Sequence, residues 1–298
     1  MTGYEELRDS VAVVDLERDV VAVRGPDAPS YLQGQLSQDV EALANGESAL
    51  SLILEPQGRV DALVRVTRKG PDEYVLDVDA GSGSDVIARL RRFKLRTKVE
   101  IEAVEGWRTV AVRGPHAPAA TDESWDRNGI EVTAAFPWPG IGGVDLLGPA
   151  PVAPPGVATA DAEAFEVRRI ECGLPRIGRE LDDRTIPEEA GVVGATVSFS
   201  KGCYTGQELV ARIDSRGGNV PRRLRIVRSD AGSVLAIGTE LLIEGQTAGV
   251  VTSVVPHPAG GQVGLGYVKR GFAGNDVAEA HGESGAVRVA LLVPPSTP

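Results

Sequence analysis

Hydrophobic and polar positions alternate along much of the first hundred residues, with the two-residue period that is typical of β-strands. Runs of this kind fall at 49–55, 59–67, 73–79 and 98–104. The first two runs flank a Pro-Gln-Gly turn and predict a hairpin. Helical spacing of apolar side chains appears between the last two, at Val86, Ile87, Leu90 and Phe93. We therefore expect mixed α and β structure here, with an amphipathic helix before the fourth strand.

One strand–turn–helix pattern occurs twice with almost the same letters. VAVRGPDAP at 21–29 returns as VAVRGPHAP at 110–118. Each copy reads as a strand, a Gly-Pro turn, and a helix with proline in its first turn. Chance reuse of a common pattern is the alternative explanation, but a match of this length favours two related α+β lobes that arose by duplication. We place the lobes near 20–105 and 107–215, within one region that spans 1–215.

The last third of the chain has a different pattern. A proline-rich hinge at 149–156 precedes a predicted helix at 159–172, for which Thr159 is the expected N-cap and Gly173 the end. From about residue 216 onward, short apolar strands alternate with glycine-rich turns. This pattern predicts a small antiparallel β-barrel as a second domain, 216–298.

Composition narrows the function classes. The net charge of −11 and the pI near 4.9 argue against general binding to nucleic acid or to anionic membranes, because both reward a positive surface. Two basic stretches, 89–98 and 222–228, run against this balance, and we interpret them as a solvated helix face and an alternating strand. The chain shows neither a signal-peptide pattern nor an apolar run that could span a bilayer, so a soluble cytosolic protein is expected.

Glu171 is the first candidate for chemistry. Ala164 and Val167 lie seven and four residues before it, so its carboxylate shares their inward stripe on the predicted helix. A carboxylate in that position needs a partner. One reading is a structural ion pair with an arginine nearby (Arg168, Arg169, Arg176 or Arg179). The other is a carboxylate held in a pocket to accept N–H donors from a ligand ring.

Cys203 is the second candidate, in the stretch SKGCYTGQE (200–208). Thr205 and Glu208 fit a capping box, so a helix is expected to begin beside the cysteine, where the helix dipole favours a thiolate. Lys201 adds a second positive charge, and the flanking glycines leave the backbone open to a ligand or partner. The alternative is a small buried hydrophobic side chain. We favour a reactive or ligand-facing thiol.

Other chemistry finds no support in the sequence. The 3 histidines lack metal-ligand spacing, and the two cysteines, Cys172 and Cys203, form neither a CxxC motif nor a disulfide framework. The chain contains no P-loop and no GxSxG elbow.

The octapeptide KGCYTGQE (201–208) resembles the signature of the YgfZ family of folate-binding proteins, which are relatives of the glycine-cleavage T-protein, an aminomethyltransferase. Other segments are similar as well. Residues 25–40 resemble the first helix of the family, and 168–181 resemble the segment that supplies a pteridine-binding carboxylate. Residues 185–191 match the loop before the signature, and 216–224 the start of the barrel.

The resemblance implies an α+β fold, an aminomethyltransferase-like cloverleaf of two related lobes around a central channel, followed by a small antiparallel barrel. The channel would bind tetrahydrofolate or a 5-substituted folate. Glu171 would accept hydrogen bonds from the pteridine ring, Phe165 would pack against the ring, and Cys203 would face the channel. The other expected folate-binding residues are Arg169, Lys201, Gly202, Tyr204, Gly206 and Gln207.

One segment departs from the aminomethyltransferases. Where those enzymes have a paired Asp-Asp after a glycine-rich turn, GRVDAL (58–63) keeps Asp61 but has Ala62 beside it. Loss of half the pair makes glycine cleavage doubtful, although Asp61 could still act as an acid or base at a folate nitrogen. Its alternative role is an exposed aspartate of the hairpin.

Three functions can be compared on this basis. The resemblance implies an accessory protein that binds folate and supports assembly or repair of iron–sulfur enzymes, with such client or assembly proteins as partners and an effect on tRNA modification through them. The alternative is a folate-dependent one-carbon transferase that uses Asp61. An RNA-binding module built on the two basic stretches fits poorly with the net charge of −11. No long apolar face remains for a dimer, so we expect a monomer.

Overall fold

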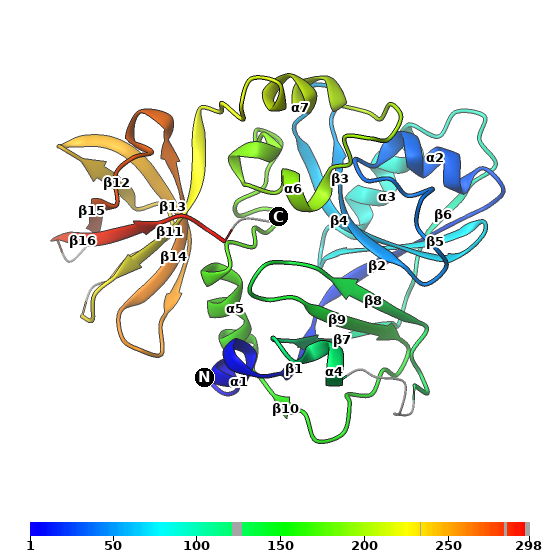
Figure 1. Ribbon diagram of the computed structural model, residues 1–298, viewed down its shortest axis with the longest axis horizontal. Helices are drawn as coiled ribbons and strands as arrows, with labels where there is room; N and C mark the ends of the chain where they lie inside the picture. The colour runs from blue at the N-terminus through cyan, green and yellow to red at the C-terminus, as the bar shows by residue number, and fades with distance from the viewer. Residues whose placement is uncertain (121–126, 233, 283–284, 296–298) are drawn as a thin grey trace.

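The computed structural model describes residues 1–120, 127–232, 234–282 and 285–295. Two five-stranded sheets lie on one side of the molecule and a closed six-stranded barrel on the other (Figure 1). Helix α5 (Ala162–Glu171) runs between the barrel and the sheets. The expected cloverleaf of α+β lobes with a C-terminal barrel is thus present.

The first lobe is built on a sheet with strand order β3-β4-β5-β2-β6. Its strands are β2 (Arg18–Arg24), β3 (Ser48–Leu54), β4 (Val60–Gly70), β5 (Glu73–Asp79) and β6 (Glu100–Ala103). Helices α2 (Ala28–Gln35) and α3 (Gly83–Arg92) pack on the sheet. Apolar side chains on the helix-covered face of the sheet form one core, in which Leu32 and Leu90 of the helices meet Val21 and Leu76 of the strands.

The second lobe takes a strand from the start of the chain. Its sheet has the order β10-β1-β7-β9-β8. The strands are β1 (Ala12–Leu16), β7 (Arg108–Arg113), β8 (Val132–Phe136), β9 (Gly143–Gly148) and β10 (Ala158–Thr159). Strand β1 pairs along its length with β7, so this lobe includes residues upstream of the first lobe. The short helices α1 (Tyr4–Asp9) and α4 (Ala117–Ala120) flank the sheet.

The two copies of the repeated sequence adopt the same local geometry. Strands β2 and β7 each end at a glycine with positive φ, 130° at Gly25 and 121° at Gly114. A Cβ atom at either glycine would lie within 2.4 Å of a neighbouring carbonyl oxygen, that of Lys98 or Ser10. Only glycine fits such a turn. The repeated letters therefore encode a repeated backbone turn.

The barrel closes in the order β11-β14-β13-β12-β15-β16. Its strands are β11 (Arg222–Ser229), β12 (Glu240–Ile243), β13 (Gln246–Pro256), β14 (Gln262–Lys269), β15 (Val277–Gly282) and β16 (Gly285–Leu292). Five of them were expected from the sequence. The sixth, β15, reads VAEAHG and has too few apolar residues to be recognised, because it shares its apolar core with five stronger strands. A short 3-10 turn, η2 (Arg270–Phe272), follows β14.

Polar contacts fix the barrel to the lobes. Glu180 is fully buried, and its carboxylate accepts a hydrogen bond of 2.6 Å from the Ser253 hydroxyl on β13. The Tyr267 hydroxyl on β14 donates to the Glu180 carbonyl at 2.8 Å. Arg222 pairs with Glu189 of the 3-10 turn η1 (Pro187–Glu189) at 3.0 Å. The chain then passes through α6 (Val193–Thr196) and α7 (Gln207–Asp214) to the barrel.

A buried network of arginines and aspartates joins the two lobes. Arg65 of β4 donates to Asp77 of its own sheet at 2.9 Å and to Asp145 of the second sheet at 2.6 Å. Arg113 donates to the same Asp145 at 2.8 Å, and Arg18 to Asp77 at 2.8 Å. Burial alone would raise the pKa of Asp145, but Arg113 and Arg65 hold that pKa at about 2. The lobes are therefore joined through a charge network in which Arg65, Asp77, Arg113 and Asp145 are almost fully buried.

We expect Asp145→Asn to destabilise the protein by about 3–5 kcal/mol at pH 7, because the buried Arg113 guanidinium loses its carboxylate and Arg65 keeps only Asp77. The folded pKa of Asp145 lies below the unfolded value of about 4, so its stabilisation is complete above that pH and is lost as the pH falls toward 2. The difference between wild type and variant should therefore narrow between pH 4 and pH 2. Urea unfolding across this range measures it.

The control for this measurement is Asp9→Asn, which removes an exposed pair with Arg8. Its unfolding midpoint should stay at the wild-type value. Equal stability of wild type and Asp145→Asn at pH 7 would show that the network does not join the lobes.

Candidate functional site

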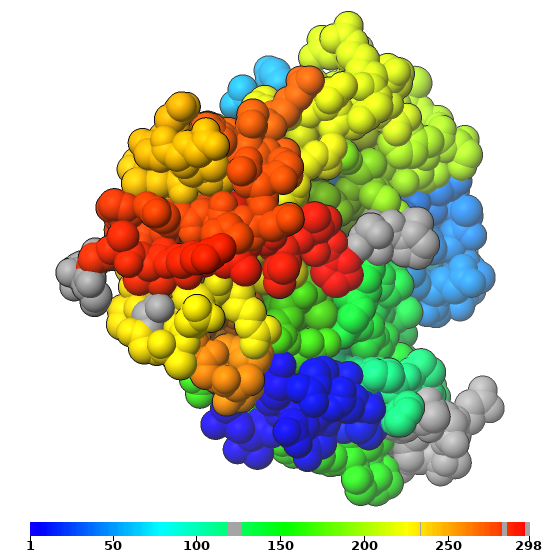
Figure 2. Space-filling model, turned by 60° about the vertical axis from the view of Figure 1, so that its left-hand side comes forward, coloured from blue at the N-terminus to red at the C-terminus, as the bar shows by residue number. Residues whose placement is uncertain are grey.

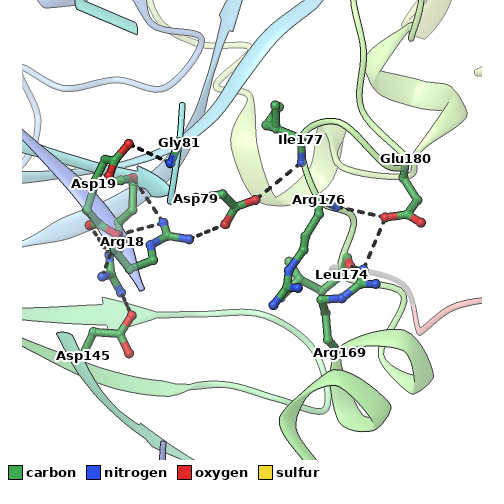
Figure 3. A network of polar contacts seen from close by, with 12 residues as sticks. Arg18, Asp19, Asp79, Gly81, Asp145, Arg169, Leu174, Arg176, Ile177 and Glu180 are labelled. Atoms are coloured by element: carbon green, nitrogen blue, oxygen red, sulfur yellow. Dashed lines mark hydrogen bonds and ion pairs between the residues drawn. The ribbon is translucent and has the colours of Figure 1, made fainter. Parts of the chain in front are cut away.

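A cavity of about 610 Å³ lies where the two lobes meet α5. Its walls come from strands β1 to β5 and β7 to β9, from α5 and from the loop 174–179. Figure 3 shows part of this wall, with Arg18 and Asp79 facing Ile177 and Arg176 of the loop. Asp79 accepts from Arg18 at 2.7 Å and from the Ile177 backbone N–H at 3.4 Å. The cavity is thus enclosed by segments that are far apart in the sequence.

Helix α5 presents one face to this cavity. Ala162, Phe165, Glu166 and Arg169 line it, at the i, i+3, i+4, i+7 spacing of a single helix face. The helix begins at Asp161, whose side chain accepts a hydrogen bond of 2.7 Å from the Ala164 N–H. The expected N-cap, Thr159, lies instead in β10, because that strand pairs with β1 before the helix starts. Phe165 and Arg169 are placed in the cavity wall, as expected for ligand-binding residues.

Glu166 is the carboxylate of this helix face. Arg169 donates to it twice, at 2.7 and 2.9 Å, and Arg176 pairs with it at 3.0 Å. Burial would raise the pKa of the Glu166 carboxyl, but Arg169, with help from Arg176 and Arg179, holds that pKa below its usual value. Glu166 is therefore an ionised acceptor at the cavity wall.

The buried end of the cavity is aromatic and cationic. Arg113, Phe136 and Phe165 are each at most 7% exposed. The Arg113 guanidinium lies 4.3 Å from the centre of the Phe136 ring. Exposed charged residues lie at the other end, including Glu17 and Arg179. The cavity thus offers a ring-sized apolar end and a charged opening.

Glu171 does not line this cavity. Its carboxylate accepts from the Tyr4 hydroxyl at 2.9 Å and from Arg168 at 2.6 Å, and it meets His257 Nε2 at 2.8 Å. Burial would raise the pKa of Glu171, but Arg168, His257 and Tyr4 hold it below its usual value. Figure 2 shows the N-terminal segment against the barrel, where this cluster ties the two together. The structure therefore favours the ion-pair reading of Glu171 and corrects the expectation that it faces the channel.

The helical twist explains this placement. Phe165 and Glu171 are six residues apart, which puts them about 120° apart around the helix, whereas Phe165 and Arg169 are only about 40° apart. A helix that turns Phe165 into the cavity must turn Glu171 toward α1 and the barrel. The signal for Glu166 was available in the sequence, since it lies on the same face as Phe165.

Lys201 holds its loop to the first lobe. Its ammonium donates to the carbonyls of Gln33, Leu36 and Gln38, each at 2.7 Å, at the C-terminal end of α2. This end of a helix favours a cation. Burial lowers the pKa of Lys201 to about 8, against the opposing charges of Asp39 and Glu41. All three donors of the ammonium are used in this contact, so Lys201 anchors the loop and does not line the cavity.

Cys203 is exposed and lies outside the cavity lining. The expected capping box is absent, because α7 begins after Gly206 with no side-chain cap. Gly206 has a φ of 83°, and a Cβ there would lie 2.4 Å from the Glu55 carbonyl oxygen. Its role is close packing against the β3–β4 turn, not access for a ligand. The structure thus does not place Cys203 at the cavity, where the channel was expected, and a reactive or ligand-facing role for its exposed thiol stays a prediction.

The remaining signature residues also lie outside the cavity wall. Gln207 accepts from the Tyr204 N–H at 3.2 Å and so closes the turn before α7. Burial raises the pKa of Tyr204 to about 12, and its ring lies 5.2 Å from the Lys201 ammonium. Gly202 is exposed, with open space where a Cβ would be.

Asp61 lies in a second, smaller cavity of about 210 Å³. Arg89 of α3 donates to its carboxylate at 2.8 Å. Ile177 borders both cavities and stands between them. Asp61 is therefore held by an arginine outside the central cavity.

In the described part of the chain, no group of three or more histidine, cysteine or acidic side chains is arranged to hold a metal ion. None of the helices in that part is both long and apolar enough to cross a membrane.

We expect a thiol probe to modify Cys203 in the native protein at pH 8 and to leave Cys172 unmodified. Cys172 is buried, and burial raises its pKa to about 11, so it presents almost no thiolate at this pH. Mass spectrometry of the alkylated protein measures both sites. Cys203→Ser should take up no probe until denaturant is added, and labelling of Cys172 in the native variant would contradict the assignment.

Comparison with known proteins agrees with the architecture. The model of the GCVT N-terminal domain family matches residues 2–144. The glycine cleavage system aminomethyltransferase T of Bartonella henselae has a similar fold, with a TM-score of 0.79 at 19% identity over 98% of this chain and 88% of that one.

Three curated relatives are similar over most of this chain. An aminomethyltransferase of Rubrobacter xylanophilus is 29% identical over 89% of this chain and 78% of its own length. The tRNA-modifying protein YgfZ of Klebsiella pneumoniae is 29% identical over 74% and 72%. The mitochondrial iron-sulfur cluster assembly factor IBA57 homologue of Neurospora crassa is 27% identical over 67% of this chain and 49% of its own length. Together with the fold, these similarities make the chain a relative of the YgfZ proteins and of the aminomethyltransferases.

Proposed function

We propose that this protein binds tetrahydrofolate, or a 5-substituted folate, in the central cavity and supports the assembly or repair of iron–sulfur clusters in client enzymes. Through such clients it would affect tRNA modification. The observation that carries the proposal is the cavity of about 610 Å³ between α5 and the two lobes, with aromatic side chains from Phe136 and Phe165 in its wall.

The residues of the cavity fit a folate. Its volume of about 610 Å³ falls within the range of 300–1,000 Å³ that is typical of small-molecule sites. Phe165 and Phe136 supply aromatic surface for a flat heterocycle, and Glu166 supplies an ionised acceptor for ring N–H groups. Arg179 lies at the exposed end, where it suits the carboxylates of a glutamate tail. When bound, the folate would supply one-carbon chemistry; these residues bind and orient it.

The names of two relatives support the second half of the proposal. One is called a tRNA-modifying protein and another an iron-sulfur cluster assembly factor. Cys203 adds a physical reason, because thiolates are the usual protein ligands of iron–sulfur clusters and this thiol is exposed. It stands on the loop that Lys201 anchors, apart from the cavity. We propose that folate and protein partner use different surfaces of the first lobe.

The transferase alternative needs a catalytic group at the folate nitrogen. Asp61 was the candidate, but its carboxylate is paired with Arg89, and Ile177 stands between it and the central cavity. The RNA-binding alternative used the basic stretch at 89–98, where Arg89 is already engaged and Arg91 donates to the Ile101 carbonyl. The transferase alternative therefore rests on the similarity to aminomethyltransferases alone, and no contact described above favours the RNA-binding alternative.

We expect calorimetric titration to give saturable binding of tetrahydrofolate and of its 5-formyl form. Glu166→Gln should weaken both by roughly tenfold or more, since a charged acceptor becomes neutral. Glu171→Gln should bind like wild type, because that carboxylate contacts Tyr4, Arg168 and His257 and not the cavity.

Asp61→Asn is the matched control, a carboxylate outside the central cavity whose loss should leave the affinity unchanged. Thermal unfolding of each variant identifies any that fail to fold. The reverse result, with Glu171→Gln losing the ligand and Glu166→Gln keeping it, would show that the pterin binds beside α1 and the barrel. No binding of either folate to wild type would overturn the proposal.

Cys203→Ser tests whether folate and the protein partner bind at different surfaces. We expect it to bind folate like wild type and to lose most of its ability to restore activity to an iron–sulfur enzyme in cells that lack the native gene. Ser200→Ala, on the same loop, is the control and should restore full activity. Full restoration by Cys203→Ser would remove the thiol from the proposal, and joint loss of folate binding would mean that the loop shapes the cavity.

A further inference from the structure

One buried arginine of the barrel lacks the carboxylate that the other buried arginines have. Four arginines in the interior each pair with a carboxylate at 2.6 to 2.9 Å: Arg65, Arg113, Arg168 and Arg169. Arg225 of β11 is 9% exposed, and its partners are the carbonyls of Leu224 at 3.0 Å and Ala273 at 3.3 Å. Buried charges in proteins are normally paired, because an unpaired charge is costly. Arg225 thus has no counter-charge among the residues that the structure describes.

The surroundings of Arg225 add positive charge. Arg223 lies two residues earlier on the same strand, and burial together with the charge of Arg223 lowers the pKa of Arg225. Glu188 pairs with Arg223 at 3.0 Å. Arg270 follows β14, where its backbone N–H donates to the Pro221 carbonyl at 2.8 Å, and its side chain has no carboxylate partner in the described part of the chain. Three arginines therefore stand against one glutamate.

A small hollow lies between these arginines and the loop that links α7 to β11. Its volume is about 40 Å³, and its wall consists of Arg223, Arg270, Ala273 and residues 218–220. This wall contains no acidic residue of the described chain. Arg225 stands behind the wall, because the Ala273 carbonyl accepts its hydrogen bond. The hollow is small enough that one bound group would contact both arginines of the wall, and the exposed side chain of Arg270 can turn toward it.

The size and charge of the hollow indicate what it can bind. A single water needs about 10–15 Å³ of such space, so about 40 Å³ holds one small group, such as a phosphate, and not a ring. Guanidinium groups donate to phosphate and carboxylate oxygens alike. Three positive charges and one negative charge leave a balance of two. A phosphate monoester carries about −1.5 to −2 at pH 7 and matches this balance, whereas a carboxylate or a phosphodiester carries a single charge.

We infer that this hollow binds a dianionic phosphate group, either free or as the monoester of a small molecule. Arg223 and Arg270 are the residues that contact the phosphate, and Arg225 supplies charge from behind them. The organic part of an ester would remain outside the hollow. The site shares no residue with the wall of the central cavity, and a folate carries no phosphate, so the inference does not rest on the function proposed above.

The test is calorimetric titration with glycerol 3-phosphate in a buffer without phosphate, at constant ionic strength. We expect saturable binding to wild type and at least tenfold weaker binding of acetate. Arg270→Ala should weaken the binding of glycerol 3-phosphate at least tenfold, since a charged hydrogen bond is lost. Arg288→Ala removes the same charge from another exposed position of the barrel, outside the hollow, and should bind like wild type.

Arg225→Met tests the charge behind the wall. The substitution fills a similar volume without a charge, so we expect the affinity for glycerol 3-phosphate to fall at least threefold. An unchanged affinity would remove Arg225 from the inference. Thermal unfolding shows whether this variant folds, and the result with Arg270→Ala decides the site even where it does not.

Inorganic phosphate forms the second arm of the titration. An affinity equal to that of the ester would mean that the hollow recognises the phosphate alone, and a weaker one that the organic part also binds. Equal affinity of wild type and Arg270→Ala for glycerol 3-phosphate, or no binding of either phosphate, would overturn the inference. Tighter binding of a single-stranded oligonucleotide without terminal phosphates, lost steeply with salt, would also overturn it and show a surface for a nucleic-acid backbone. Arg270→Ala should bind tetrahydrofolate like wild type, which keeps this result separate from the proposed function.

Discussion

The Arg65 side chain lies between the two sheets and holds the two lobes in one relative arrangement. It is fully buried and divides its hydrogen bonds between Asp77 of the first lobe and Asp145 of the second. A buried ion pair adds little net stability compared with apolar packing, but it accepts only one arrangement of its partners. The network therefore sets the relative position of the lobes, and with it the shape of the cavity between them.

The same network continues into the cavity wall. Asp77 binds Arg18, Arg18 binds Asp79, and Asp79 accepts from the backbone of Ile177 in the loop after α5. On the other side, Arg169 connects the cavity carboxylate Glu166 with the buried Glu180, which holds the barrel. Cavity, loop and barrel thus share one set of charge-assisted hydrogen bonds. The loop that carries Cys203 is attached separately, because Lys201 donates to the Leu36 carbonyl at the C-terminal end of α2.

The sequence predicted the elements better than the site. Alternation and apolar runs between turns located the strands of the first lobe and five strands of the barrel, although β3 and β5 are buried on both faces. Which side chains meet could not be read in the same way. Glu171 was selected from a motif position, although helical geometry put Glu166 beside Phe165. Helix α7 begins after Gly206 and not at the capping box expected from Thr205. Gly206 packs against the β3–β4 turn, which is about 150 residues away in the sequence, so the local pattern did not reveal the contact. Arg113 could not be recognised at all, because the identical residue in the first copy, Arg24, lies at the surface.

The membership of β1 in the second lobe has a consequence for how the chain is made. Strand β1 leaves the ribosome before its partner strand β7, which begins at Arg108, and before its parallel neighbour β10, which begins at Ala158. The first lobe is continuous from Arg18 to Ala103, so it can fold before the partner strand of β1 has been synthesised. Closing the second sheet then pairs strands that are about a hundred residues apart in the sequence. Such pairing is slow, because the entropy of loop closure is lost before the contacts form. Nascent chains halted before β7 should therefore protect the first lobe from protease while their N-terminal segment is still cut.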